Sequence, residues 1–103
     1  MAKSIRSVIK KVIVTHPRTG TERKFDEVVY SSFKSAIIQS LKKSRGKTFT
    51  ELTDDVIRIF RKNKPGFKGS IPWYTISVLL DLQTRGITET FTEKGKKLNR
   101  LSH

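Results

Sequence analysis

Few residues of this chain are of the types that carry out catalysis. The sequence contains two histidines, His16 and His103, and no cysteine. Neither histidine has a second ligand at metal-site spacing. The acids Asp54 and Asp55 fall in the first turn of a predicted helix, where the helix dipole favours negative charge, so we interpret them as structural. The stretch 66–69 lacks the spacing of a phosphate-binding glycine loop. The sequence therefore predicts no enzyme and no metal or cofactor site.

Positive charge is the dominant feature of the composition. Lysine and arginine total 22 against 9 acidic residues in 103, which gives a net charge of +13. Such a surplus attracts polyanions over roughly 8 Å, the Debye length at physiological salt. Nucleic acid is the commonest polyanion that a basic domain binds, and we favour double-stranded DNA. RNA, anionic lipid and charge that only maintains solubility are the alternatives.

No feature of the sequence predicts a membrane protein. The start of the chain is rich in lysine, without the continuous apolar stretch of a signal peptide. No segment approaches the roughly 20 apolar residues that cross a bilayer. We therefore expect a cytoplasmic protein with no membrane partner.

Hydrophobic spacing predicts three helices, at about 26–43, 50–63 and 71–85. Asp26 is the expected N-cap of the first, which buries a stripe of residues four apart: Val29, Phe33, Ile37 and Leu41. Thr50 is the expected N-cap of the second helix, with Thr48 as its rival because Glu51 lies three residues later.

Short β segments accompany these helices. Lys47 to Phe49 is expected to be extended, and residues 87–101 form a hairpin whose turn is 93–96. The order is helix, short strand, helix, turn, helix, hairpin. This is the plan of an α+β winged helix-turn-helix domain, here spanning 26–103, whose C-terminal hairpin is the wing.

A basic leader, residues 1–25, precedes this domain. Its first part has helical spacing, Val12 to Thr15 is typical of a strand, and 16–20 contains the proline and glycine of a turn. The leader either packs on the domain or extends as a basic arm.

Two sequence strings carry a family resemblance. The segments 49–52 and 82–87 are similar to winged-helix transcription regulators in general. Gly69 to Tyr74 together with Leu80 to Gly86 resemble a family of small stand-alone bacterial winged-helix proteins of unassigned function, in which a His-Pro segment precedes the first helix. The resemblance covers about residues 12–101 and implies the fold more firmly than any function.

The third predicted helix is the expected groove-facing element, as the second helix of a helix-turn-helix motif is. Helical projection places Ile71, Thr75, Val78, Leu79 and Leu82 toward the core. It places on the opposite side Ser70, Trp73, Tyr74, Ser77, Asp81 and Thr84. No lysine or arginine lies between Gly69 and Thr84, although arginine to guanine is the commonest specific base contact.

Lysines and arginines instead flank this helix. The predicted phosphate contacts are Lys62, Lys64 and Lys68 before it, and Lys94, Lys96, Lys97 and Arg100 in the wing. Ser70, Trp73, Tyr74 and Ser77 complete the predicted site. We expect Tyr74 to be more exposed than Trp73, with packing in the core as the alternative for both rings. These features predict weak sequence preference.

Two other partners remain open. The aromatic face of the third helix could bind another protein, with Trp73, Tyr74 and Leu80 as an apolar patch. A homodimer is compatible with the sequence.

Overall fold

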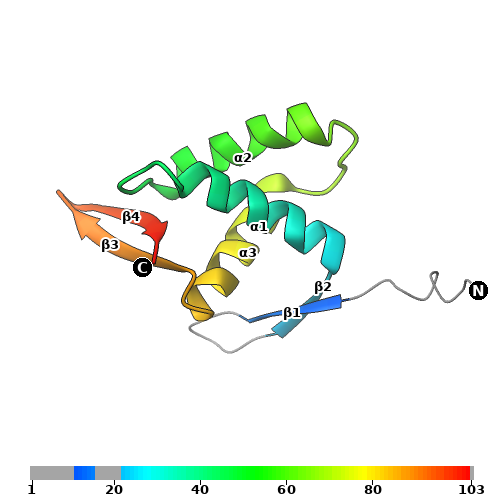
Figure 1. The fold of residues 1–103 in the computed structure, drawn as a ribbon, viewed down its shortest axis with the longest axis horizontal. Coiled ribbons are helices and arrows are strands. Elements are labelled where there is room, and N and C mark those ends of the chain that lie inside the picture. The colour runs from blue at the N-terminus through cyan, green and yellow to red at the C-terminus, as the bar shows by residue number, and fades with distance from the viewer. Residues whose placement is uncertain (1–10, 16–21, 103) are drawn as a thin grey trace, which may run out of the picture.

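The computed structural model describes residues 11–15 and 22–102, and its elements are arranged as a bundle of helices with a β-hairpin at each end of the chain (Figure 1). The strands are β1 (Lys11–Thr15), β2 (Glu22–Asp26), β3 (Thr88–Glu93) and β4 (Lys96–Leu101), and the helices are α1 (Glu27–Leu41), α2 (Phe49–Asn63) and α3 (Ile71–Thr84). The three helices and the hairpin that follows them confirm the predicted α+β class and are consistent with the winged-helix layout.

Helix α1 begins as predicted and ends two residues early. The Asp26 carboxylate accepts hydrogen bonds from the backbone N–H groups of Val28 and Val29, at 2.8 and 3.4 Å. Phe33, Ile37 and Leu41 are buried, but Val29 is only half-buried and Tyr30 is buried beside it.

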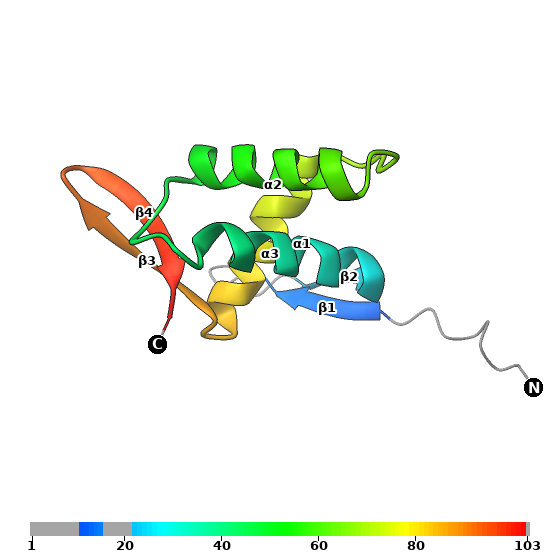
Figure 2. The ribbon, with the colours of Figure 1, turned by 45° about the horizontal axis from the view of Figure 1, so that its top comes forward.

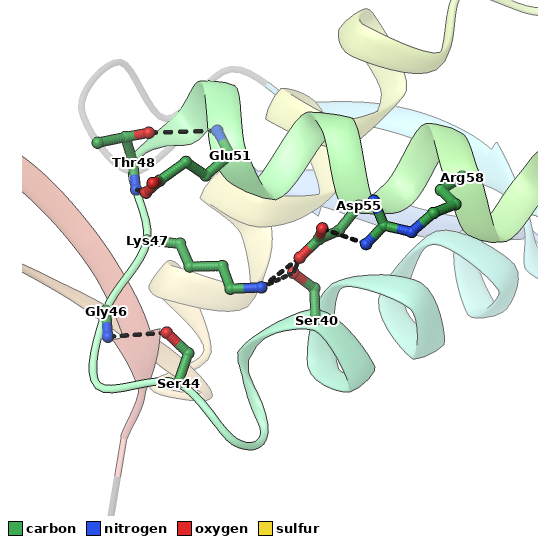
Figure 3. Close-up of polar contacts among 8 residues, drawn as sticks. All are labelled: Ser40, Ser44, Gly46, Lys47, Thr48, Glu51, Asp55 and Arg58. Carbon is green, nitrogen blue, oxygen red and sulfur yellow. Dashed lines mark hydrogen bonds and ion pairs between the residues drawn. The ribbon is translucent and has the colours of Figure 1, made fainter.

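Helix α2 is capped by Thr48, so the preference for Thr50 was wrong. The Thr48 hydroxyl accepts from the Glu51 N–H at 3.2 Å, and the Glu51 carboxylate accepts from the Thr48 N–H at 2.9 Å (Figure 3). This reciprocal pair satisfies two backbone donors at once, which a cap at Thr50 would leave free. The two hydrogen bonds to Thr48 lower the pKa of Glu51.

Helix α3 leads directly into the wing. Ser70 caps it, Pro72 lies in its first turn, and Gly86 follows it with a φ of 77°. The turn between β3 and β4 has positive φ at Lys94 and Gly95, 52° and 78°, as a two-residue hairpin turn requires. Of the predicted extended segment 47–49, Lys47 is bridged to Asn99 of β4 and Thr48 is extended, but Phe49 already belongs to α2, because the helix is capped at Thr48.

The leader packs on the domain where the structure describes it. β1 confirms the predicted strand and pairs antiparallel with β2, with Val12 opposite Phe25. Phe25 is buried, and its ring lies 5.6 Å from that of Trp73 and 5.3 Å from that of Tyr74. The remaining leader predictions, the turn at 16–20 and the basic side chains of 1–10, lie outside the described residues.

The wing and the turn between α2 and α3 lie at opposite ends of the domain. In Figures 1 and 2 the wing lies at one end and the turn between α2 and α3 at the other, with α1 and α3 between them. The β1–β2 hairpin lies below the helices in Figure 1. Two loops that are distant in the sequence are thus held on either side of α3.

Asp55 of α2 joins three segments around the α1–α2 loop (Figure 3). Its carboxylate accepts hydrogen bonds from Ser40 of α1, at 2.6 Å, from Lys47, and from Arg58, at 2.5 Å. Burial raises the pKa of Asp55, but the hydrogen bonds from Lys47, Ser40 and Arg58 outweigh it and lower the pKa to about 2. The structural interpretation of this acid is supported, but its predicted place was wrong: because α2 begins at Phe49, Asp55 lies in the second turn and Glu51 is the acidic residue of the first.

We expect this network to add stability that is lost in acid. Because the pKa of Asp55 is lower in the folded than in the unfolded state, its contribution is complete above pH about 4 and disappears as the pH falls through about 2. Urea unfolding should show Asp55→Asn losing about 1 kcal/mol at pH 6 but little at pH 2. The exposed Asp54→Asn is the control. An equal effect of Asp55→Asn at both pH values would contradict the prediction.

Candidate nucleic-acid interface

Asp81 does not lie on the outward side of α3, so that part of the predicted reading surface was wrong. Its side chain is fully buried, accepts a hydrogen bond from the Tyr30 hydroxyl at 2.6 Å, and pairs with Arg85 at 2.6 Å. A helical projection of α3 could not reveal this contact, because Tyr30 belongs to α1, 51 residues away. The carboxylate is therefore no obstacle to an approaching phosphate.

The two aromatic residues of α3 have the reverse of the predicted exposure. Trp73 is 42% exposed and rests against Phe25. Tyr74 is half-buried and stacks on Phe33, with ring centroids 5.2 Å apart and planes at 17°. Phe67 also touches the Tyr74 ring, edge to face. Tyr74 thus fills the aromatic core, whereas Trp73 presents one face to solvent.

The rest of the outward side of α3 is uncharged. Pro72 is exposed, and Ile76, Ser77 and Leu80 are half-buried. The Ser70 hydroxyl is used as the helix cap and accepts from the Trp73 N–H at 3.3 Å. Predicted core residues Thr75, Val78, Leu79 and Leu82 are buried.

The turn between α2 and α3 is a cluster of exposed cations. Lys62, Lys64 and Lys68 are all exposed, and none of them forms an ion pair within the described part of the chain. These lysines lie just before the start of α3. They keep the position that the sequence predicted for phosphate contacts.

The wing separates its four cations onto different faces. The Phe91 ring and Leu98 lie against Gly46, so these residues mark the side of the hairpin that faces the α1–α2 loop. Because side chains alternate along a strand, the strand register assigns every other residue to the same side. We call this side the inner face of the wing: Glu89, Phe91, Glu93, Lys96, Leu98 and Arg100.

The opposite side is here called the outer face, and its base is buried at Thr88 and Asn99. Its residues are Thr88, Thr90, Thr92, Lys97, Asn99 and Leu101. It has no acidic residue, and Thr92 and Lys97 are exposed. On the inner face, Arg100 is paired with Glu89 at 2.6 Å and its guanidinium lies 4.3 Å from the centre of the Phe91 ring. Lys96 lies directly opposite Glu93 in the strand register.

The structure therefore divides the predicted wing site. Lys94 in the turn and Lys97 on the outer face are exposed and lack an ion pair among the described residues, whereas Arg100 is already engaged. Thr92, beside Lys97, was missed by the sequence analysis. Alternation along the predicted hairpin was the signal that could have found it.

Most acidic side chains of the described residues are used inside the fold. Those with structural hydrogen bonds or ion pairs are Asp26, Glu51, Asp55, Asp81 and Glu89. The positive surplus is consequently left on exposed segments, which are the end of α1 with the α1–α2 loop, the α2–α3 turn and the tip of the wing.

Other kinds of site were sought among the described residues. No three His, Cys, Asp or Glu side chains in 11–15 and 22–102 gather closely enough to hold a metal ion. Within the same ranges, the helices are too short or too polar to span a bilayer. His16 and His103 lie outside the part that the structure describes.

Comparison with known proteins gives a family but no relative of assigned activity. No curated protein and no solved structure matches the sequence at a significant level. Residues 11–98 match a family of unknown function, a range close to the 12–101 over which the sequence resembled a family of unassigned function. The chain therefore belongs to the family of unknown function DUF6958.

Proposed function

We propose that this protein binds nucleic acid, most favourably double-stranded DNA, through phosphate contacts made by two basic loops. One observation carries the proposal: the exposed lysines of the α2–α3 turn and of the wing lack ion pairs among the described residues, while the acids Asp55, Asp81 and Glu89 are engaged internally. In this proposal the protein is a cytoplasmic binding protein and not an enzyme.

The positions of the loops support contact with a duplex. They flank α3 at opposite ends of the molecule in both views (Figures 1 and 2). A helix at the groove with a basic loop on either side suits phosphate contacts on both strands. Since the outward side of α3 has no cation, we propose weak sequence preference. With about five phosphates contacted, log K should fall against log salt with a slope near −4.5.

Lys97 should contribute to binding more than its neighbour Lys96. The two lysines carry the same charge and are both exposed, but only Lys97 lies on the acid-free outer face of the wing. Lys97→Gln should weaken binding to a random duplex about eightfold at about 0.1 M salt and reduce the salt slope by about one. Fluorescence anisotropy over a salt series measures both quantities.

Lys96→Gln is the matched control and should leave the slope unchanged. Equal losses in the two variants would mean that net charge alone drives binding and that the wing has no phosphate-contacting face. Absence of binding by the wild-type protein at low salt would overturn the proposed function itself.

A second candidate function is self-association through α3. The specific observation is the uncharged outward side of this helix, on which Trp73 is 42% exposed and Ile76 and Leu80 are half-buried. On a chain of net charge +13, an uncharged side is where a second copy can approach with least repulsion.

Salt distinguishes the two candidates because it weakens phosphate contacts and screens repulsion between copies. Light scattering at about 0.5 M salt should then show a dimer that Trp73→Ala converts to a monomer. Because the phosphate contacts do not involve Trp73, Trp73→Ala should bind the duplex at low salt with the affinity of the wild-type protein. A monomer at every salt concentration would exclude the second candidate.

A further inference from the structure

A cavity of about 490 Å³ lies between the end of α1 and the inner face of the wing. Its volume is within the range of roughly 300–1,000 Å³ typical of small-molecule sites. The half-buried side chains of Phe91 and Leu101 provide its accessible apolar lining, and the buried Leu41 lies beneath it. The sequence does not reveal this site, because the two walls are contributed by segments about half the chain apart.

The charged residues around this cavity are not equally available. Arg100 is paired with Glu89 and stacked over Phe91, so its charge is already compensated. Lys42 and Arg45 also line the cavity, are exposed, and form no ion pair within the described ranges. They are the cations left to hold a ligand.

We propose that this cavity binds a small amphipathic carboxylate. The apolar body of the ligand lies on Phe91 and Leu101, above the buried Leu41, and Arg45 and Lys42 hold its carboxylate at the rim. The guanidinium fork of arginine matches a carboxylate with two parallel hydrogen bonds. A single negative charge fits better than a phosphate dianion, because Glu89 and Glu93 line the same cavity and repel a second charge.

Such a ligand joins two parts of the molecule. One wall belongs to α1 and the other to the wing, which also contacts the α1–α2 loop through the packing on Gly46 and the Lys47–Asn99 bridge. Occupation of the cavity therefore fixes the wing against α1. This inference is independent of the proposed nucleic-acid binding.

The test uses 3-phenylpropionate as the probe and its uncharged amide as the comparison. Titration followed by methyl NMR should shift the resonances of Leu41 and Leu101, with the amide binding about tenfold more weakly because it lacks the charged hydrogen bonds. Arg45→Gln should lower the affinity for the carboxylate probe by the same factor. Arg61→Gln removes an equal charge from the exposed far end of α2 and should leave this affinity unchanged.

Three outcomes overturn the proposal. They are equal affinity in the Arg45→Gln and Arg61→Gln variants, shifts that spare Leu41 and Leu101, and no shift at millimolar probe. The first two would show attraction by net charge alone. Because both substituted arginines are exposed, both variants should fold, and their affinities for the probe can be compared directly.

Discussion

Replacing Asp81 by alanine is expected to lower the free energy of unfolding by about 3 kcal/mol. The Asp81 side chain has no solvent exposure, whereas that of Arg85 is 46% exposed and can turn to water when its partner is lost. The main cost is therefore the buried Tyr30 hydroxyl, which loses its acceptor. Burial, followed by the hydrogen bond to Asp81, raises the pKa of Tyr30, so the hydroxyl stays protonated and remains a donor.

Urea denaturation of Asp81→Ala, Tyr30→Phe and the double variant measures this directly. Tyr30→Phe should lower the free energy of unfolding by about 1 kcal/mol, because the Asp81 carboxylate still pairs with Arg85 in this variant. The double variant should cost clearly less than the sum, since removing both partners leaves no unsatisfied hydroxyl. Additive effects, or a loss of less than about 1 kcal/mol for Asp81→Ala, would show that this network contributes little.

Phe33→Ala is expected to be the most destabilising single substitution in the helical core, at about 4 kcal/mol. The Phe33 ring has no solvent exposure and contacts the rings of Phe60, Phe67 and Tyr74, with centroids 4.3, 5.4 and 5.2 Å away. It thereby joins α1 to α2, to the α2–α3 turn and to α3. Its removal leaves a cavity between elements that cannot all close upon it.

Calorimetry should show a fall in melting temperature of about 20 °C for Phe33→Ala. Phe33→Leu keeps much of the volume and should cost under half as much. The control is Val28→Ala on the same helix, where the side chain is 67% exposed and little should change. A shift below about 5 °C for Phe33→Ala would mean that the core closes around the missing ring.

Local patterns in the sequence were enough to predict the order of the elements. The Asp26 cap and the apolar stripes of α1 and α3 depend on neighbours within a few residues. The same reasoning failed at Thr50 because two caps were chemically acceptable there. Only the reciprocal bond with Glu51 decides in favour of Thr48.

The candidate site was predictable only in part, since its details depend on distant partners. The lysines Lys62, Lys64, Lys94 and Lys97 are exposed, because they lie in turns or at the ends of the elements beside them. The burial of Asp81 depends on a tyrosine from another helix, and the half-burial of Tyr74 on three phenylalanines. No period in the sequence encodes either contact.

The bridge between Lys47 and Asn99 has a consequence for the order in which the chain folds. Two backbone hydrogen bonds, of 2.9 and 2.7 Å, join residues that are 52 positions apart. Closing so long a loop costs chain entropy before any contact compensates for it. Helices α2 and α3 lie inside that loop, so their packing on each other and on α1 shortens it in advance. The wing should accordingly dock last, onto a helical core that is already formed.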